Sequence, residues 1–442
     1  MEIIIVGAGI GGLSAALSLS LAGHRVIILE SAPAPAEIGA GVQLAPNATK
    51  CFWKWGMGAD ISANSALPEA FNILRGSDGE LLGTVPFAPF QEQYGAPYIS
   101  IHRAEIHQIL HRHALRAGAE LRLGSRVIHY DFEGGLVRLA TGEQLQADLV
   151  IAADGVKSVA RKAFFPELGD GLEKTGWAAY RSMVPVEKIK ANPKTAHVVK
   201  RHTCECWSGD QHCVVSYLVN NGSMLNMAFS HPDDVDASGW TSDQCLAELK
   251  RIYSGWNPTL AALLDMAEPF PQNWPVLQVK TLPTWKSKSG RFVLMGDAAH
   301  AMAFYLSMGV SSAVEDADVL TACLALMEKS DTTLQQAMCI FENVQKPRAE
   351  AVSAASLHAG NTLQLSPGAG QDVCNLALAS DGASIGTVED EQFYKHKQSY
   401  GIADKQIRDW CYSYDAEAAV EQEWQKSKQK RGAGPVAPSS MM

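Results

Sequence analysis

Three glycines near the N-terminus have the spacing needed to bind a phosphate group. Gly7, Gly9 and Gly12 lie in "GAGIGG", directly after the apolar run EIIIV. In a strand–turn–helix unit the first glycine permits a tight turn, the second admits a pyrophosphate, and the third lets helix and strand pack closely. The helix N-terminus adds unpaired N–H groups and a partial positive charge. Glu30 ends the next apolar run, where its carboxylate can accept hydrogen bonds from both ribose hydroxyls, so the pattern predicts an adenine dinucleotide site.

Two distant Asp–Gly and Gly–Asp pairs separate FAD from NAD as the bound nucleotide. "DLVIAADGVKSVAR" (148–161) is predicted to be a strand that ends at Asp154-Gly155. "RFVLMGDAAH" (291–300) is predicted to be another strand, which ends at Gly296-Asp297. A simple nicotinamide dehydrogenase lacks this three-part pattern, so the sequence favours FAD.

These motifs require a parallel sheet to position them. The runs EIIIV and "RVIILE" read as buried strands on either side of a helix that ends at Gly23, which makes a βαβ unit. A helix is expected over 103–117, strands around 120–152, and helices from 312 to about 364. Short β-like runs over 175–285 predict an inserted sheet domain.

The predicted fold is therefore α/β, with a Rossmann-like nucleotide-binding domain that contains an insertion. The nucleotide-binding domain covers 1–174 and 286–364, and the β-sheet substrate domain covers 175–285. A helical C-terminal region is expected over 365–425, and the Gly/Pro/Ser-rich residues 426–442 are expected to be disordered.

Composition excludes several classes of partner. A net charge of −10 and a pI near 5.7 argue against nucleic acid or an anionic membrane surface. No apolar run reaches the length of about 18 residues that a transmembrane segment needs. The nine cysteines are scattered and lack zinc-site spacing, so we expect free thiols, no metal site and a cytoplasmic location.

Further motifs occur in one order along residues 1 to 415. They are "EIGAGVQLAPNA" (37–48), "IHRAEI" (101–106), "AAYRSMVP" (178–185), "YSGWNP" (253–258) and "DWCYSYDAE" (409–417). With the glycine fingerprint, they resemble the single-component, FAD-dependent aromatic hydroxylases of the para-hydroxybenzoate and salicylate hydroxylase type. The similarity is strongest to the salicylate hydroxylase-like branch, whose fungal members act in aromatic polyketide and related pathways.

The resemblance implies a para-hydroxybenzoate hydroxylase-type fold and a monooxygenase activity. NAD(P)H would be a transient co-substrate, and O2 would react through a flavin C4a-hydroperoxide. The substrate would be a phenolic or electron-rich aromatic or polycyclic metabolite, and the product a hydroxylated, dearomatised or epoxidised compound. Baeyer–Villiger insertion uses the same intermediate. A monomer or homodimer is expected.

The resemblance also assigns cofactor contacts. The adenosine end would be bound by Glu30 at the ribose, Arg103 at the pyrophosphate and Val127 near the adenine. Asp154 would serve the pyrophosphate and NAD(P)H. The remaining contacts would run along the flavin and its ribityl chain, from Ala40, Gly41, Asp297, Gly309 and Val310.

On the substrate side, the resemblance points to a pair on the inserted sheet. Arg181 would hold a phenolate or carboxylate by charge-assisted hydrogen bonds, and Tyr217 would share that phenolate. The alternatives are a structural ion pair for Arg181 and a core aromatic for Tyr217. His212, His231 and Tyr305 are candidate proton shuttles of the same pocket.

The loop after Asp297 departs from the pattern of this branch, which reads GDAAHP-x-x-P-x-x-x-Q-G. Here it reads "GDAAHAMAFYLSMG", with Ala301 and Phe304 at the proline positions and Met308 at the glutamine position. Two accounts stay open. The pocket, with Phe304 in its wall, is reshaped for a larger apolar substrate of a monooxygenase, or the protein is an FAD-bound isomerase, cyclase or dehydratase.

Overall fold

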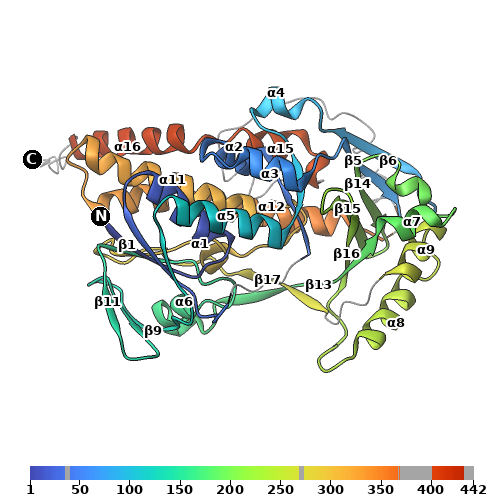
Figure 1. Ribbon diagram of the computed structural model, residues 1–442, viewed down its shortest axis with the longest axis horizontal. Helices are drawn as coiled ribbons and strands as arrows, with labels where there is room; N and C mark the ends of the chain where they lie inside the picture. The colour runs from blue at the N-terminus through green and yellow to red at the C-terminus, as the bar shows by residue number, and fades with distance from the viewer. Residues whose placement is uncertain (35–39, 268–272, 367, 369–400, 433–442) are drawn as a thin grey trace, which may run out of the picture.

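The computed structural model describes residues 1–34, 40–267, 273–366, 368 and 401–432. A five-stranded parallel sheet of order β18-β12-β1-β2-β8 forms the left half of the molecule in Figure 1. Its strands are β1 (Glu2–Val6), β2 (Arg25–Leu29), β8 (Glu120–Arg122), β12 (Leu149–Ala152) and β18 (Phe292–Leu294). The apolar runs of β1 and β12 are buried because helices cover the sheet.

The helix that follows the first strand packs into a layer of helices on this sheet. α1 (Ile10–Leu21) packs against α5 (Arg103–Arg116) and α11 (Gly309–Lys329). α11 in turn packs against α2 (Pro46–Lys54), α12 (Leu334–Leu363) and α16 (Ala416–Gly432). The helix expected over 103–117 and the helices expected after 312 are confirmed by α5, α11 and α12.

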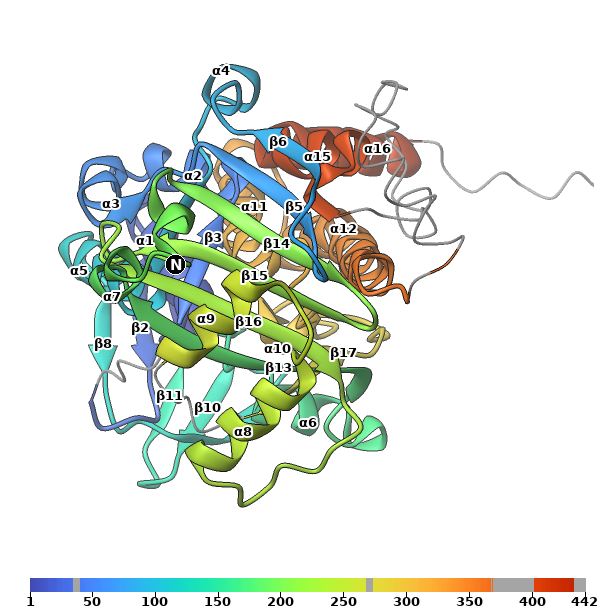
Figure 2. The same cartoon turned by 90° about the vertical axis from the view of Figure 1, so that its right-hand side faces the viewer.

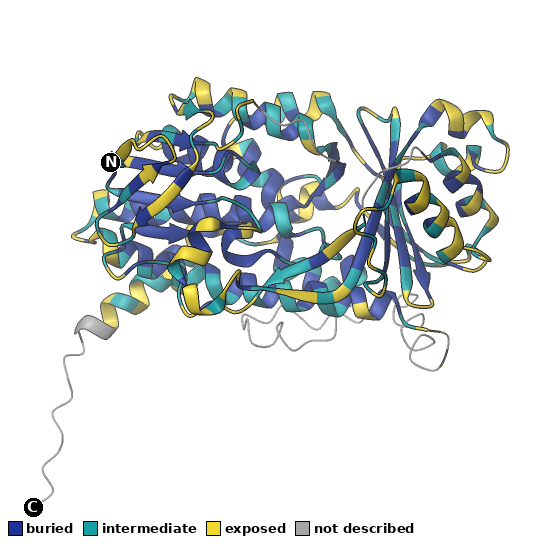
Figure 3. Ribbon diagram, turned by 90° about the horizontal axis from the view of Figure 1, so that it is seen from below, coloured by how far each residue is buried: buried dark blue, intermediate teal, exposed yellow. Residues whose placement is uncertain are grey.

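The second half is a seven-stranded sheet of order β17-β13-β16-β15-β14-β5-β6. Its strands are β5 (Ala70–Arg75), β6 (Leu81–Pro86), β13 (Leu172–Pro185), β14 (Thr203–Gly209), β15 (His212–Val219), β16 (Met224–Pro232) and β17 (Trp274–Val279). The sheet domain therefore is not confined to the predicted 175–285: β5 comes from the first third of the chain and pairs in parallel with β14. In Figure 2, α8 (Ser242–Ile252) and α9 (Pro258–Met266) lie in front of this sheet, and Figure 3 shows their outer surfaces as exposed.

Smaller elements complete the two halves. Two three-stranded sheets contain β3 (Gly41–Leu44), β4 (Ser65–Ala66) and β7 (Ile99–His102), and β9 (Val127–Asp131), β10 (Leu136–Leu139) and β11 (Gln144–Gln146). The remaining α-helices of the described residues are α3 (Gly58–Asn64), α4 (Phe90–Tyr94), α6 (Val159–Phe164), α7 (Val186–Ala191), α10 (Asp297–His300) and α15 (Lys405–Tyr412). Single 3-10 turns occur at η1 (Pro166–Leu168), η2 (Ala196–Val199) and η3 (Gly401–Ala403).

The C-terminal helix α16 packs on the helices of the nucleotide-binding half, and it does not end at residue 426. α16 continues to Gly432, so the expected disorder of 426–432 is wrong; the basic run "KSKQKR" continues a helix whose first part packs on α11 and α12. Most of 365–400, predicted as helical, and all of 433–442 lie outside the described residues.

A buried ion pair fastens these C-terminal helices. Arg348 of α12 donates to both oxygens of Glu315 in α11, at 2.9 and 2.7 Å, and both side chains are 3% exposed. Arg348 also donates to the carbonyl oxygen of Cys411, and its guanidinium lies 3.8 Å from the ring centre of Tyr414. Burial opposes the charge, but the attraction of Glu315 raises the pKa of Arg348. The pair therefore joins α11, α12 and the segment around α15.

The architecture is α/β with a Rossmann-like unit and an attached sheet domain, as predicted. Of the helices described, none combines the length and the apolar character that crossing a membrane requires.

We expect Arg348→Met to destabilise the fold by about 3–5 kcal/mol, because it leaves the Glu315 carboxylate buried without its counter-charge. Urea denaturation of the FAD-free protein measures this. Lys190→Met is the matched control, since its pair with Glu187 is exposed, and such pairs contribute about 0–1 kcal/mol. Equal loss in both variants would contradict the anchoring role of Arg348.

Candidate active site

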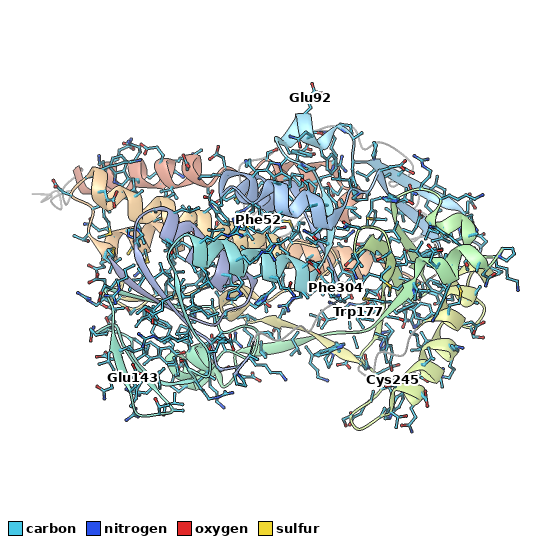
Figure 4. All side chains as sticks on the ribbon, in the orientation of Figure 1. Phe52, Glu92, Glu143, Trp177, Cys245 and Phe304 are labelled. Carbon is cyan, nitrogen blue, oxygen red and sulfur yellow. The ribbon has the colours of Figure 1, made fainter. Side chains whose placement is uncertain are left out.

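A cavity of about 360 Å³ lies between the parallel sheet and the seven-stranded sheet. Its walls come from the turn after β1, the tips of β12 and β18, the loop 301–308, the start of α11, and one face of the seven-stranded sheet. Phe304, one of the lining residues, is labelled near the middle of the molecule in Figure 4. The site therefore draws on chain segments that are far apart in the sequence.

The glycine fingerprint has steric reasons for two of its glycines. Gly7 has φ +104°, and an added Cβ would lie 2.4 Å from the carbonyl oxygen of Ala153. At Gly12 an added Cβ would lie 2.1 Å from the carbonyl oxygen of Gly7. A Cβ at Gly9 would meet no atom within 4 Å, because Gly9 faces the cavity. The turn thus packs tightly on the sheet side and leaves room on the other.

A second cavity of about 170 Å³ continues from Gly9 towards Glu30. The Glu30 carboxylate stands at the end of β2, where it accepts from the N–H groups of Ala8 and Ala32 at 2.9 and 2.8 Å. Arg103, the first residue of α5, lines both cavities. The two cavities therefore meet at Gly9 and Arg103, and the Glu30 carboxylate lines the smaller one.

Two helix N-termini open into the main cavity without capping side chains. α1 begins after Gly9 and α11 begins after Met308, neither has a side-chain cap, and neither has an acidic residue in its first turn. Gly309 and Val310 of α11 line the cavity. Free N–H groups at a helix N-terminus bind anions and favour negative charge. The two helix starts therefore suit a pyrophosphate and the electron-rich edge of a reduced flavin.

Asp297 stands at the start of α10 with its side chain exposed to the cavity. Desolvation by the cavity walls raises its pKa, while His300, Arg103 and Arg161 oppose that shift. Arg161 is 1% exposed and donates to the carbonyl oxygen of Ala298 at 2.9 Å. This buried guanidinium fixes the turn that carries Asp297, which is the cavity carboxylate best placed to accept hydroxyl groups.

Two residues expected at the cofactor serve other structural contacts. Both oxygens of Asp154 cap α6, accepting from Ser158 Oγ at 2.5 Å and from the N–H of Val159 at 2.8 Å. Its neighbours line the cavity through Ala153 and Gly155. Val127 is 6% exposed within the core, and the Glu30 cleft is lined instead by Leu121 and Leu123. The adenine and pyrophosphate roles of these two residues stay predictions.

Ala40 contacts the start of α5, and Gly41 contacts the seven-stranded sheet. The carbonyl oxygen of Ala40 accepts from the N–H of Arg103 at 3.0 Å, and the N–H of Gly41 donates to Asn226 Oδ1 at 2.9 Å. A Cβ at Gly41 would lie 2.6 Å from the Tyr217 ring. β3 therefore approaches the substrate sheet as closely as its backbone allows.

The strand register sorts the substrate sheet into three rows on its cavity face. From β3 outward the rows contain Tyr217 and Asn226, then Arg181, Ala228 and Val215, then Ser230 and Cys213. Neighbouring rows are separated by about 6.5 Å, the rise of two strand residues. Charge is concentrated in the middle row, at Arg181.

Arg181 and Tyr217 are brought to the same cavity. Arg181 is half-buried, and its side chain donates no hydrogen bond to any residue in the described part of the chain. Tyr217 is 7% exposed; desolvation raises its pKa, and the charge of Arg181 opposes that rise. Within the described residues this cation has no hydrogen-bond partner, and it lines the cavity beside a protonated phenol, which suits an anionic oxygen of a ligand.

His212 and His231 do not reach this cavity, so their predicted place in the pocket is wrong. Period-two alternation turns both to the opposite face of the sheet. His212 lies against the rings of Tyr253 and Trp256, and His231 stacks on Tyr180 with ring centres 4.9 Å apart. His231 is 2% exposed, and burial lowers its pKa. His231 therefore belongs to the core of this half, whereas His212 is only partly buried beside Tyr253 and Trp256.

The three departures in the loop after Asp297 have different consequences. Ala301 and Met308 are 5% and 1% exposed and pack inwards. Phe304 lines the cavity with its ring 4.6 Å from that of Tyr305. Only Phe304 therefore reshapes the wall, and it makes that wall apolar.

One contact of this loop has no signal in the sequence motifs. Ser307 has φ +56°, a conformation that favours glycine, and its hydroxyl donates to Gln43 Oε1 at 2.8 Å. Gln43, in β3, is 5% exposed and lines the cavity. The chain between α10 and α11 is thus tied to β3 directly beside the start of α11.

This fold and site define a flavoprotein with a nucleotide-binding unit and a sheet-walled substrate pocket. Residues 1–354 match the family model described as FAD binding domain. The FAD-dependent monooxygenase OpS4 of Beauveria bassiana (strain ARSEF 2860) is 31% identical over 424 residues, 95% of this chain and 96% of that protein. The 6-hydroxynicotinate 3-monooxygenase of Bordetella bronchiseptica (strain ATCC BAA-588 / NCTC 13252 / RB50) is 32% identical over 359 residues, 80% and 88% of the two chains.

A solved structure shares the fold over nearly the whole chain. CtdE, crystallised in complex with FAD and substrate 4, superposes with a TM-score of 0.79 at 24% identity, covering 98% of this chain and 100% of that one. The chain belongs to the FAD-dependent monooxygenases that contain this FAD-binding domain. The predicted family, fold, cofactor and enzyme class are confirmed, and the isomerase, cyclase or dehydratase alternative is not favoured.

We expect Glu30→Ala to weaken FAD binding by about 10- to 100-fold, because hydrogen bonds to a charged group contribute about 1.5–3 kcal/mol. The ratio of flavin to protein absorbance after dialysis measures occupancy. Glu120→Ala, which removes an exposed carboxylate from β8, is the control and should keep its flavin. Full occupancy of Glu30→Ala would refute the adenosine assignment.

Proposed function

We propose that this monooxygenase uses NAD(P)H and O2 to oxygenate a phenolic or other electron-rich aromatic or polycyclic substrate, whose anionic oxygen is bound by Arg181. The observation that carries the proposal is the Arg181 guanidinium, which faces the cavity without a protein hydrogen-bond partner in the described structure. A guanidinium stabilises a phenolate by charge-assisted hydrogen bonds. A phenolate has more electron density at its ring carbons than the phenol, and this favours attack by an electrophilic oxygen.

Different residues of the cavity bind the substrate oxygen, contact the substrate rings and hold FAD. Arg181 keeps the substrate hydroxyl deprotonated, and Tyr217, held protonated by burial, donates to the same oxygen. Phe71, Val215 and Phe304 provide apolar surface for the rings and exclude water from the reacting face. Glu30, Arg103, Asp297 and the starts of α1 and α11 would hold FAD. Bound FAD supplies the redox and oxygen-activating chemistry.

The relatives support an aromatic substrate. The Bordetella relative is named for 6-hydroxynicotinate, a small aromatic ring with an ionisable hydroxyl group. The proposal also includes a cytoplasmic location and a monomeric or homodimeric state. The eight cysteines of the described residues are all free thiols, which is typical of a reducing compartment.

We expect Arg181→Ala to lower kcat/KM by about 10- to 100-fold for phenols, from the loss of a charge-assisted hydrogen bond. Its FAD occupancy should match that of the unmodified enzyme, because the guanidinium belongs to the substrate sheet. NAD(P)H oxidation in air with product analysis over a panel of phenols and indoles measures turnover. Arg201→Ala, on the exposed surface of the same domain, is the control.

Two results would contradict the proposal in different ways. Loss of flavin in Arg181→Ala would show that the guanidinium belongs to the cofactor site. Absence of substrate-stimulated NAD(P)H oxidation in the unmodified enzyme over the whole panel would contradict the substrate class.

A further inference from the structure

A second polar point lies in the outer row of the substrate sheet, one row beyond Arg181. The hydroxyl of Tyr305 is 2.8 Å from Ser230 Oγ and accepts from Gln364 Nε2 at 3.2 Å. Tyr305 lines the cavity, whereas Ser230 and Gln364 are 1% and 2% exposed. The cluster combines residues of the loop after α10, the strand β16 and the end of α12.

The ring of Tyr305 is held in one place. Gly360 lies within α12, where a Cβ would come 2.3 Å from the Tyr305 ring. Glycine inside a helix costs about 1 kcal/mol relative to alanine, and here only glycine leaves room for the ring. Phe304 covers another side at 4.6 Å between ring centres. The hydroxyl therefore has a fixed direction.

The available donors and acceptors determine where the Tyr305 hydroxyl proton points. A tyrosine hydroxyl has one proton and two lone pairs, and the Gln364 amide nitrogen can only donate, so it takes one lone pair. If Tyr305 donated to Ser230, the Ser230 proton would be buried with no other acceptor among the described residues. If Ser230 donates, the unpaired proton is that of Tyr305, a residue that lines the cavity. The second arrangement avoids a buried unsatisfied donor.

We propose that the Tyr305 hydroxyl donates a hydrogen bond to a carbonyl oxygen of the substrate whose phenolate lies on Arg181, and that the enzyme therefore accepts hydroxyaryl ketones. This inference rests on the proposed function. The two polar points belong to neighbouring rows, about 6.5 Å apart along the strands, with Ala228 of β16 in the middle row beside Arg181. The apolar walls between them fit a flat ring system with an oxygen function at each end.

Tyr305 is thus a specificity-determining residue, and the experiment is a comparison of two ligands that differ in one group. 4-Hydroxybenzophenone contains the carbonyl, and 4-benzylphenol has a methylene in its place. Each is titrated into FAD-loaded oxidised enzyme without NAD(P)H, and the change in flavin absorbance gives a Kd. One net hydrogen bond contributes about three- to tenfold in affinity, so the unmodified enzyme should prefer the ketone by that factor.

Tyr305→Phe keeps the ring and removes the hydroxyl, so it should bind both ligands with equal affinity. Tyr180→Phe is the matched control: Tyr180 lies on β13, its hydroxyl is buried without a partner among the described residues, and it stacks on His231 on the other face of the sheet. That variant should keep the preference for the ketone. Arg181→Ala should weaken both ligands alike.

Equal binding of the two ligands to the unmodified enzyme overturns the inference, and so does a ketone preference that survives in Tyr305→Phe. Both results leave the proposed function intact if Arg181→Ala weakens binding. If neither phenol binds to the unmodified enzyme, the proposed function fails and the inference fails with it.

Discussion

The flavin-binding half depends on the buried carboxylate of Asp316. It is 0% exposed and accepts from the N–H of Gly296 at 2.8 Å, from His300 Nε2 at 2.7 Å and from Gln345 Nε2 at 2.8 Å. A buried charge is tolerated only when it is paired and hydrogen-bonded. Burial alone would lower the pKa of His300, but the attraction of Asp316 raises it. The Asp316 carboxylate in α11 therefore anchors the tip of β18, both ends of α10 and the middle of α12. Asp297 lies between two of these anchored residues, Gly296 and His300, so its position is fixed.

Glu315, the residue before Asp316, anchors α11 to two further helices. Glu315 accepts from Arg348 and from Asn47 Nδ2, which joins α11 to α12 and to α2. Two consecutive acidic residues thus face different partners on one helix, although the sequence around them reads as an ordinary polar interruption. Because α11 begins at the cavity, its anchoring here also sets where its N-terminus points. The electrostatic environment offered to the flavin is a consequence of ion pairs one to two turns away.

The glycine turn and the strand-tip carboxylate of the cofactor half could be placed from the sequence because they depend on local backbone geometry, whereas the roles of Val127 and Asp154 stay predictions. Gly7, Gly9 and Gly12 have a fixed spacing, and an acidic residue at a strand tip has one direction available, so local sequence is enough. The substrate half could not, because its cavity face depends on strand register. Arg181 and Tyr217, to which the resemblance points, line the cavity, whereas His212 and His231 do not. Alternation along β15 separates 213, 215 and 217 from 212, 214 and 216, and alternation along β16 separates 226, 228 and 230 from 231. Which set faces the cavity depends on long-range pairing. For the same reason the sequence did not predict that β5 belongs to this sheet, because its partner β14 is remote in the sequence.

The closeness of the two halves at Gly41 links substrate choice to cofactor position. The Gly41 N–H donates to Asn226, and an added Cβ would overlap both Asn226 and Tyr217. Asn226 and Tyr217 form the row of the substrate sheet next to the one that contains Arg181. A shift of β16 or β15 to admit a different ring system would therefore displace β3, which also holds the Ser307 loop through Gln43. We expect variation in substrate size to be accommodated with least disturbance at the outer row and at Phe304, because no hydrogen bond of the described residues joins these side chains to β3.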